Sequence, residues 1–174
     1  VRAFLDVCPE TMVAYSCSKN FGLYRERTGC FLVLTTSPRD AEAVASHLAD
    51  IARAVYSMPP AHGAAIVETI LGSEELTALW HSELGGMRER MTGLRRELAD
   101  ALNAATGSDA FSPLAHQTGM FSLLPLQGPV TDMLRIQSAV YMPASGRINI
   151  AGLTSDTIGP LAAQLAPYLQ ATLR

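Results

Sequence analysis

Lysine is almost absent from this chain of 174 residues, because Lys19 is the only one and the twelve other basic residues are arginines. The basic side chains form no long run and the formal net charge is -3, so nothing in the sequence indicates a nucleic-acid surface. The one local excess of arginine, in residues 88–96, alternates with glutamate and is typical of a solvated helix face. We therefore expect no nucleic-acid partner.

Cysteine is also scarce, and long apolar runs are missing. The three cysteines, Cys8, Cys17 and Cys30, match no metal-binding spacing, which favours free thiols in a reducing cytoplasm and no metal site. No stretch reaches the ~18 apolar residues of a membrane span, and the start has no signal-peptide layout. We expect a cytoplasmic protein without a membrane partner.

The first residues lack a helix start signal. VRAFLDVCPE shows helical spacing from Val1 onward without a capping residue before it, so we expect a helix entered part-way and a fragment of a longer protein. A hydrophobic share of 48% and a charged share of 17% are ordinary for a globular chain.

Hydrophobic periodicity predicts helices that alternate with short strands, which indicates an α/β or α+β class. Ser37 is expected to cap one helix, and residues 58–60 to end it. The longest helix carries an apolar stripe from Leu76 to Leu102, including Trp80, that we expect to be core. Gly85 with Gly86 is expected to bend this helix. The predicted strands are 11–16, 30–36, 120–124, 140–142 and 147–151, and the continuous apolar run of 11–16 predicts a buried strand. The predicted helices are 1–7, 38–55, 61–71, 74–105, 130–138 and 155–173.

The polar loop SCSKNFGLYRERTG, residues 16–29, concentrates the chemistry of the chain. Lys19 follows an apolar strand and is a candidate amine nucleophile, whose pKa burial would lower from its ordinary ~10.4. Ser16, Ser18 and Arg27 offer hydroxyl and guanidinium donors to a dianionic phosphate. On these residues alone, an exposed loop with a solvated lysine remains the alternative.

The spacing S-x-S-K-x-x-G-L-x-x-x-R-x-G resembles the pyridoxal-phosphate attachment motif of class I aminotransferases, in the aspartate/aromatic subfamily. Hydroxyls stand three and one positions before the lysine, and an arginine stands eight after it. The resemblance implies that Lys19 binds the cofactor and moves a proton on the substrate, while Ser16, Ser18 and Arg27 bind the phosphate. Thr28 departs from the motif, since an aliphatic residue is usual there.

The resemblance extends over essentially the whole chain and implies a substrate site. In MPASGRINIAG, Arg147 would grip the substrate α-carboxylate, and in HQTGMFS, Phe121 would lie near it. In ARAVYSMPPAHGA, Arg53 would reach across a homodimer to a dicarboxylate. Val55 and Met58 are apolar where aspartate-specialised relatives tend to be polar, which favours tyrosine and phenylalanine over aspartate. Without the resemblance, Arg147 reads as a surface arginine, Arg53 as a polar-face arginine, and each histidine as structural.

The implied fold is that of fold type I enzymes, with a large α/β domain of mostly parallel strands and a smaller α+β domain. Residues 1–56 would end the large domain, and residues 57–174 would form an interdomain helix and the small domain. The family's groups for the pyridine ring would precede Val1, so the chain alone is expected not to transaminate. Two alternatives remain open, a related pyridoxal-phosphate lyase and a non-catalytic regulator with an aminotransferase-like domain.

Overall fold

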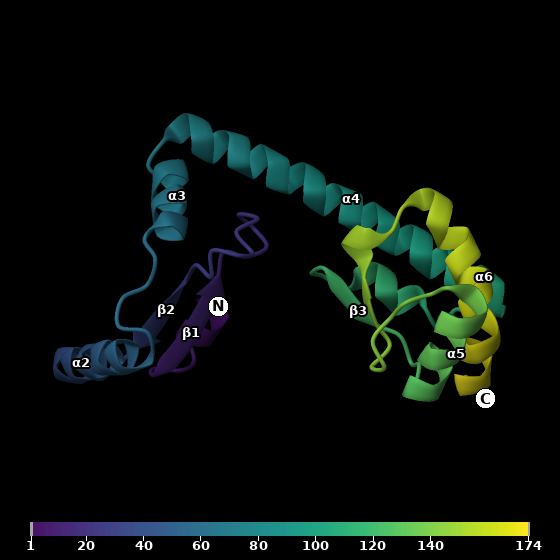
Figure 1. The fold of residues 1–174 in the computed structure, drawn as a ribbon, viewed down its shortest axis with the longest axis horizontal. Coiled ribbons are helices and arrows are strands. Elements are labelled where there is room, and N and C mark those ends of the chain that lie inside the picture. The colour runs from purple at the N-terminus through teal and green to yellow at the C-terminus, as the bar shows by residue number, and fades with distance from the viewer. Residues whose placement is uncertain (1, 174) are drawn as a thin grey trace. The chain divides into compact units, whose positions relative to one another are not determined.

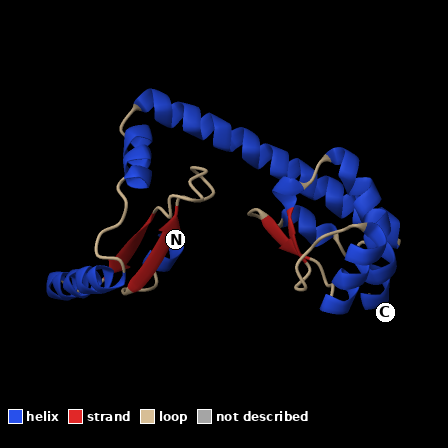
Figure 2. Cartoon of the chain, viewed as in Figure 1, coloured by secondary structure: helices blue, strands red, loops and turns tan. Residues whose placement is uncertain are grey.

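The computed structural model describes residues 2–173, which form two compact units, one ending at Leu84 and the other beginning at Gly85. Both units mix helices and strands, as expected for the predicted class (Figure 2). No helix within residues 2–173 combines the length and the apolar character needed to cross a bilayer. The predicted division at residues 56/57 concerns the domains of a full-length enzyme and stays a prediction.

The first unit is built on two antiparallel strands, β1 (Thr11–Ser16) and β2 (Gly29–Leu34), which follow the short helix α1 (Arg2–Leu5) (Figure 1). Thr11 lies opposite Leu34 and Ser16 opposite Gly29, so the segment between the strands is a hairpin loop. The helices α2 (Pro38–Val55) and α3 (His62–Leu71) follow, and α4 (Glu74–Thr106) begins in this unit. The two predicted strands are confirmed to within two residues.

The faces of this strand pair are less buried than the apolar sequence suggested. Met12, Phe31 and Leu32 are all exposed, which contradicts the expectation of a buried strand. A continuous apolar run is typical of a strand that is covered on both faces in a complete sheet. Here two strands have one neighbouring helix, so most of their surface is uncovered. The two strands pair in antiparallel fashion, which a sheet of mostly parallel strands can include.

Helix α2 begins where the sequence predicted. The Ser37 side chain accepts a hydrogen bond of 3.2 Å from the Asp40 backbone N–H, and Pro38 occupies the first turn, where its missing N–H costs nothing. The helix ends at Val55, as predicted, ahead of the proline-containing segment 58–60. A capped start of this kind stabilises a helix by about 1 kcal/mol.

The second unit contains the end of α4, the turns η1 (Ser112–His116) and η2 (Ile150–Gly152), the helices α5 (Gly128–Ser138) and α6 (Ser155–Thr172), and the strands β3 (Phe121–Leu123) and β4 (Arg147–Asn149). β3 and β4 are antiparallel, with Phe121 opposite Asn149 and Leu123 opposite Arg147. Fully buried side chains define one core, and they are Leu98, Leu102, Leu134, Ile150, Leu165 and Leu169.

Two predictions for this region were wrong. Residues 140–142 form no strand, because Ala139 takes a left-handed conformation (φ 52°) that ends α5 and turns the chain away from pairing. The apolar stripe of α4 is core only from Leu94 onward, and Leu76, Leu79 and Met87 are exposed. A helix of 33 residues is about 50 Å long, which is more than one compact unit of this size covers.

Candidate functional site

The loop that carries Lys19 is closed at its base by backbone hydrogen bonding. The Cys17 N–H donates to the Thr28 carbonyl over 3.0 Å, directly after the last pair of the β1–β2 ladder. Ser16 and Ser18 therefore stand at one side of the closure, and Arg27 stands at the other. These three residues, at most eleven positions apart in sequence, are thus held at one end of the hairpin.

The Lys19 side chain is exposed, as in the alternative of an exposed loop with a solvated lysine. Its Nζ lies 4.5 Å from the centroid of the Tyr24 ring, a cation–π contact within the loop. The residue before it, Ser18, is buried, and the residue after it, Asn20, donates from its side-chain amide to the Tyr15 hydroxyl. The structure thus fixes the backbone on both sides of Lys19 and leaves the amine accessible to a ligand.

The two serines form a small cluster of hydrogen-bonding groups. The Ser16 hydroxyl donates to the Ser18 hydroxyl over 3.0 Å and accepts from the Ser18 backbone N–H over 3.2 Å. Arg27 adopts a left-handed conformation (φ 53°), and its guanidinium donates to the Tyr24 carbonyl over 3.1 Å. One amine, two hydroxyls and one guanidinium in a single loop match the chemistry of an aldehyde that carries a phosphate.

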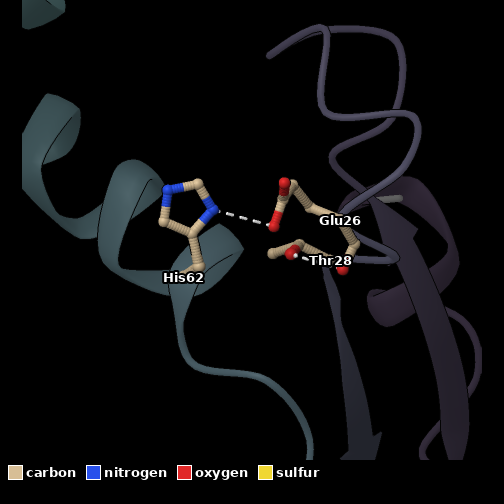
Figure 3. Close-up of polar contacts among 3 residues, drawn as sticks. All are labelled: Glu26, Thr28 and His62. Atoms are coloured by element: carbon tan, nitrogen blue, oxygen red, sulfur yellow. Dashed lines mark hydrogen bonds and ion pairs between the residues drawn. The ribbon is translucent and has the colours of Figure 1, made fainter.

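Glu26 is the acidic residue that lies closest in sequence to this donor set, and it is engaged elsewhere. Its carboxylate lies 3.0 Å from His62 Nδ1, at the first residue of α3 (Figure 3). Next to His62, Gly63 is buried so closely that a Cβ there would overlap the side chains of Thr28 and Glu26. The start of α3 is therefore fitted against the loop, and the carboxylate has a partner other than Arg27.

A cavity of about 500 Å³ adjoins Arg27. It is lined by the loop residues 25–29 and by the segment between α2 and α3, including Met58. Of the residues predicted to set substrate preference, the structure brings Met58 to this cavity, while Arg53 and Val55 lie exposed in the last turn of α2 outside its lining.

In the second unit, the residues predicted to hold the substrate carboxylate lie together. The Arg147 guanidinium carbon is 4.9 Å from the centroid of the Phe121 ring, and the two side chains come from the paired strands β4 and β3. Both line a cavity of about 360 Å³ whose other walls include Tyr141 and Asn149. The arginine is exposed at this cavity, so its donors are available to an anion.

A buried arginine, Arg95, forms hydrogen bonds to β3 and to the turn before it. Arg95 on α4 is only 2% exposed and donates to the Ser122 hydroxyl in β3 and, over 2.6 Å, to the Gly119 carbonyl in the preceding turn. Burial lowers the pKa of Arg95 from its ordinary value. The sequence placed this arginine on a solvated helix face, which was wrong, because the helix turns it toward the core of the second unit.

The contacts that the sequence did not reveal join residues far apart along the chain. Glu26 pairs with His62, and the Trp80 indole donates to the Asn20 carbonyl over 2.7 Å. The four histidines are scattered along the sequence, which indicates a structural role for His62 as for the others. The one available signal was the motif itself, which marked the loop but not what packs against it.

Comparisons with known proteins give one consistent result. The family model described as aminotransferase class I and II matches residues 1–165. The tyrosine aminotransferase of Rhizobium meliloti is 52% identical over 162 residues, which are 93% of this chain and 41% of that protein.

Solved structures agree with this match. A structure of an aromatic amino acid aminotransferase with 3-indolepropionic acid has a TM-score of 0.91 and 42% identity, over 95% of this chain and 43% of that one. The aromatic-amino-acid aminotransferase of Burkholderia pseudomallei, covalently bound to pyridoxal phosphate, has a TM-score of 0.87 and 39% identity, over 97% of this chain and 42% of that one. The chain therefore spans about two fifths of the length of the relatives it matches.

Proposed function

The chain belongs to the class I and II aminotransferases, and we propose that it supplies the lysine side of an active site that moves an amino group between an aromatic amino acid and a 2-oxo acid with pyridoxal phosphate. The observation that carries the proposal is the hairpin loop in which the chain's only lysine stands exposed beside two serines and Arg27. The match to a structure with covalently bound pyridoxal phosphate supports the choice of cofactor.

The pyridine ring of the cofactor, when bound, withdraws electrons from the substrate α-carbon and so makes its proton removable. Lys19 has two tasks in this scheme. Its amine would hold the cofactor covalently through the aldehyde carbon, and once free it would take and return the substrate α-proton. The exposure of its side chain on a fixed backbone suits both tasks.

Ser16, Ser18 and Arg27 hold the cofactor phosphate. Arginine presents planar donors that match phosphate oxygens, and the serine hydroxyls add short hydrogen bonds. The pairing of Glu26 with His62 keeps that carboxylate occupied close to the anion site. Held by this set, the phosphate would orient the cofactor toward Lys19 of the same loop.

Arg147 recognises the substrate α-carboxylate. A two-pronged arginine–carboxylate contact fixes orientation as well as charge, and the Phe121 ring under the guanidinium limits how far the arginine can turn. An aromatic donor is favoured because Met58, at the cavity beside Arg27, is apolar and because the Rhizobium relative is a tyrosine aminotransferase. Aspartate, received by Arg53 of a second subunit in a homodimer, is the second substrate in this proposal.

The chain by itself is expected to bind cofactor without turning over substrate, since it spans 41% of a relative's length. Assay of the 174 residues with tyrosine and a 2-oxo acid checks this, and turnover at a rate typical of enzymes, about 1 per second or more, would contradict it.

The binding step is tested by absorbance titration with pyridoxal phosphate, alone and in competition with inorganic phosphate. The unaltered chain is expected to bind saturably and to lose cofactor as phosphate is added, while a Lys19→Ala variant shows no absorbance change. Binding that phosphate does not weaken, or that survives in the Lys19→Ala variant, would refute the assignment of the loop.

A further inference from the structure

Trp80 connects α4 to the loop that carries Lys19. Its indole N–H donates to the Asn20 carbonyl over 2.7 Å, and its ring stacks on Phe21 with 4.5 Å between centroids and 9° between planes. These two residues directly follow Lys19, although Trp80 is 60 positions further along than Asn20. The helix thus contacts the loop at the Asn20–Phe21 peptide, one residue past Lys19.

The same stretch of loop is held from other directions as well. The Asn20 side chain donates to the Tyr15 hydroxyl of β1, and the Phe21 N–H donates to the Cys17 carbonyl over 3.3 Å. On the other side of the lysine, the Ser18 N–H donates to the Ser16 hydroxyl. Trp80 is the one of these contacts that comes from outside the hairpin.

Trp80 is not simply one more member of a continuous core. Leu76 and Leu79, its neighbours on the first half of α4, are exposed, whereas Trp80 is partly buried against the loop. A tryptophan with an apolar ring and a single donor is suited to a contact of this mixed kind, because the ring stacks while the N–H finds an acceptor.

We propose that Trp80 is a positioning residue for Lys19, a role that rests on the function proposed above. By fixing the Asn20 and Phe21 backbone, the indole sets the direction in which the lysine side chain leaves the loop. Covalent attachment and proton transfer both need the amine within about 3–3.5 Å of the reacting atom, and a displacement of about 1 Å is costly. Loss of the indole should therefore change the reactivity of Lys19 in a chain that is still folded.

The test compares two substitutions with a matched control. Trp80→Phe keeps the stacking ring and loses the donor, Trp80→Leu loses both, and Leu79→Ala alters an exposed side chain on the same turns of α4. Each chain is treated briefly with pyridoxal phosphate and borohydride, and labels are mapped by mass spectrometry. Because Lys19 is the only lysine, the amino-terminal amine is the single other amine and serves as an internal reference.

The ratio of label at Lys19 to label at the amino terminus is the readout. We expect Trp80→Leu to lower this ratio about tenfold and Trp80→Phe to lower it about threefold. The ring stack and the hydrogen bond each contribute up to about a factor of ten. Leu79→Ala should leave it unchanged. Circular dichroism of each variant well below its melting temperature shows that the comparison is made on folded chains.

Equal ratios in the unaltered chain and in folded Trp80→Leu would overturn the proposal. Should Trp80→Leu fail to fold, Trp80→Phe decides, because its ring still fills the site, and an unchanged ratio in that variant overturns the role of the donor. Failure of the proposed function has a different signature, in which the unaltered chain labels equally fast with pyridoxal phosphate and with pyridoxal, which has no phosphate.

Discussion

At the scale of single residues, the chemistry of the loop follows from which side chains are exposed and which are held. Ser18 is buried and hydrogen-bonded, Lys19 is exposed on a fixed backbone, and Arg27 is exposed in a left-handed conformation. Because an accessible cation on an ordered loop binds an anion without a large ordering cost, Arg27 should contribute to affinity for phosphate rather than to folding.

Removal of the Arg27 guanidinium tests whether this residue contributes to phosphate affinity rather than to folding. Arg27→Ala should weaken pyridoxal phosphate binding about tenfold or more, because a charge-assisted hydrogen bond contributes about 1.5–3 kcal/mol. Binding of pyridoxal should not change. The matched control is Arg39→Ala, another exposed arginine of the same unit, at the start of α2. Equal losses from both substitutions would show that only general charge matters.

Cys17 should be the least reactive thiol of the three. Burial, and secondarily the neighbouring Cys30, raise the pKa of the Cys17 thiol above its ordinary 9.0. The folded chain holds this proton more tightly than the unfolded chain does, so its contribution to stability is complete below pH 9 and falls as pH rises further. Timed alkylation with mass mapping should modify exposed Cys30 first and Cys17 last. Cys17 reacting as fast as Cys30 would contradict its burial.

At the scale of helices and strands, three long-range contacts hold the candidate site groups. The start of α3 fits against the loop through His62 and Gly63, α4 reaches the loop through Trp80, and further along α4 reaches β3 through Arg95. Each contact includes a hydrogen bond between two elements that are far apart in the sequence. The long helix thus supports a predicted site segment in each unit.

Arg95 is the contact whose loss should cost most stability. Arg95→Leu leaves the Gly119 carbonyl without this donor and removes one partner of the Ser122 hydroxyl, which should lower the free energy of unfolding of the second unit by about 2–3 kcal/mol. Chemical denaturation measures this, with Arg96→Leu as the control, because Arg96 is the exposed neighbour on the same helix. A loss below about 0.5 kcal/mol for Arg95→Leu would show that the buried guanidinium is dispensable.

At the scale of the whole molecule, local patterns predicted most elements, and contacts across the chain escaped prediction. The cap at Ser37 and the strand at Thr11–Ser16 were found from neighbouring residues alone. The ion pair of Glu26 with His62 spans 36 positions, and nothing local in the sequence indicates it. The exposure of β1, β2 and the first half of α4 was missed because apolar periodicity records a preference for burial without showing whether a partner surface is present.

For the candidate site too, the sequence indicated the local segments but not the contacts between distant residues. The resemblance of the Lys19 motif and of the Arg147 segment to an enzyme family pointed to both places, and what each residue binds stays a prediction. The cavity at Met58 and the cation–π contact between Arg147 and Phe121 depend on how the chain folds back on itself.

The most direct test of the central claim is to label the chain with pyridoxal phosphate and, in parallel, with pyridoxal, then to reduce with borohydride and map the products. We predict one label per chain, at Lys19, formed with the phosphate-bearing aldehyde at concentrations that leave the amino-terminal amine unmodified, and a much weaker reaction with pyridoxal. Labels mainly at the amino terminus, or equal labelling of Lys19 by the two aldehydes, would contradict the claim that this loop is a phosphate-guided cofactor site.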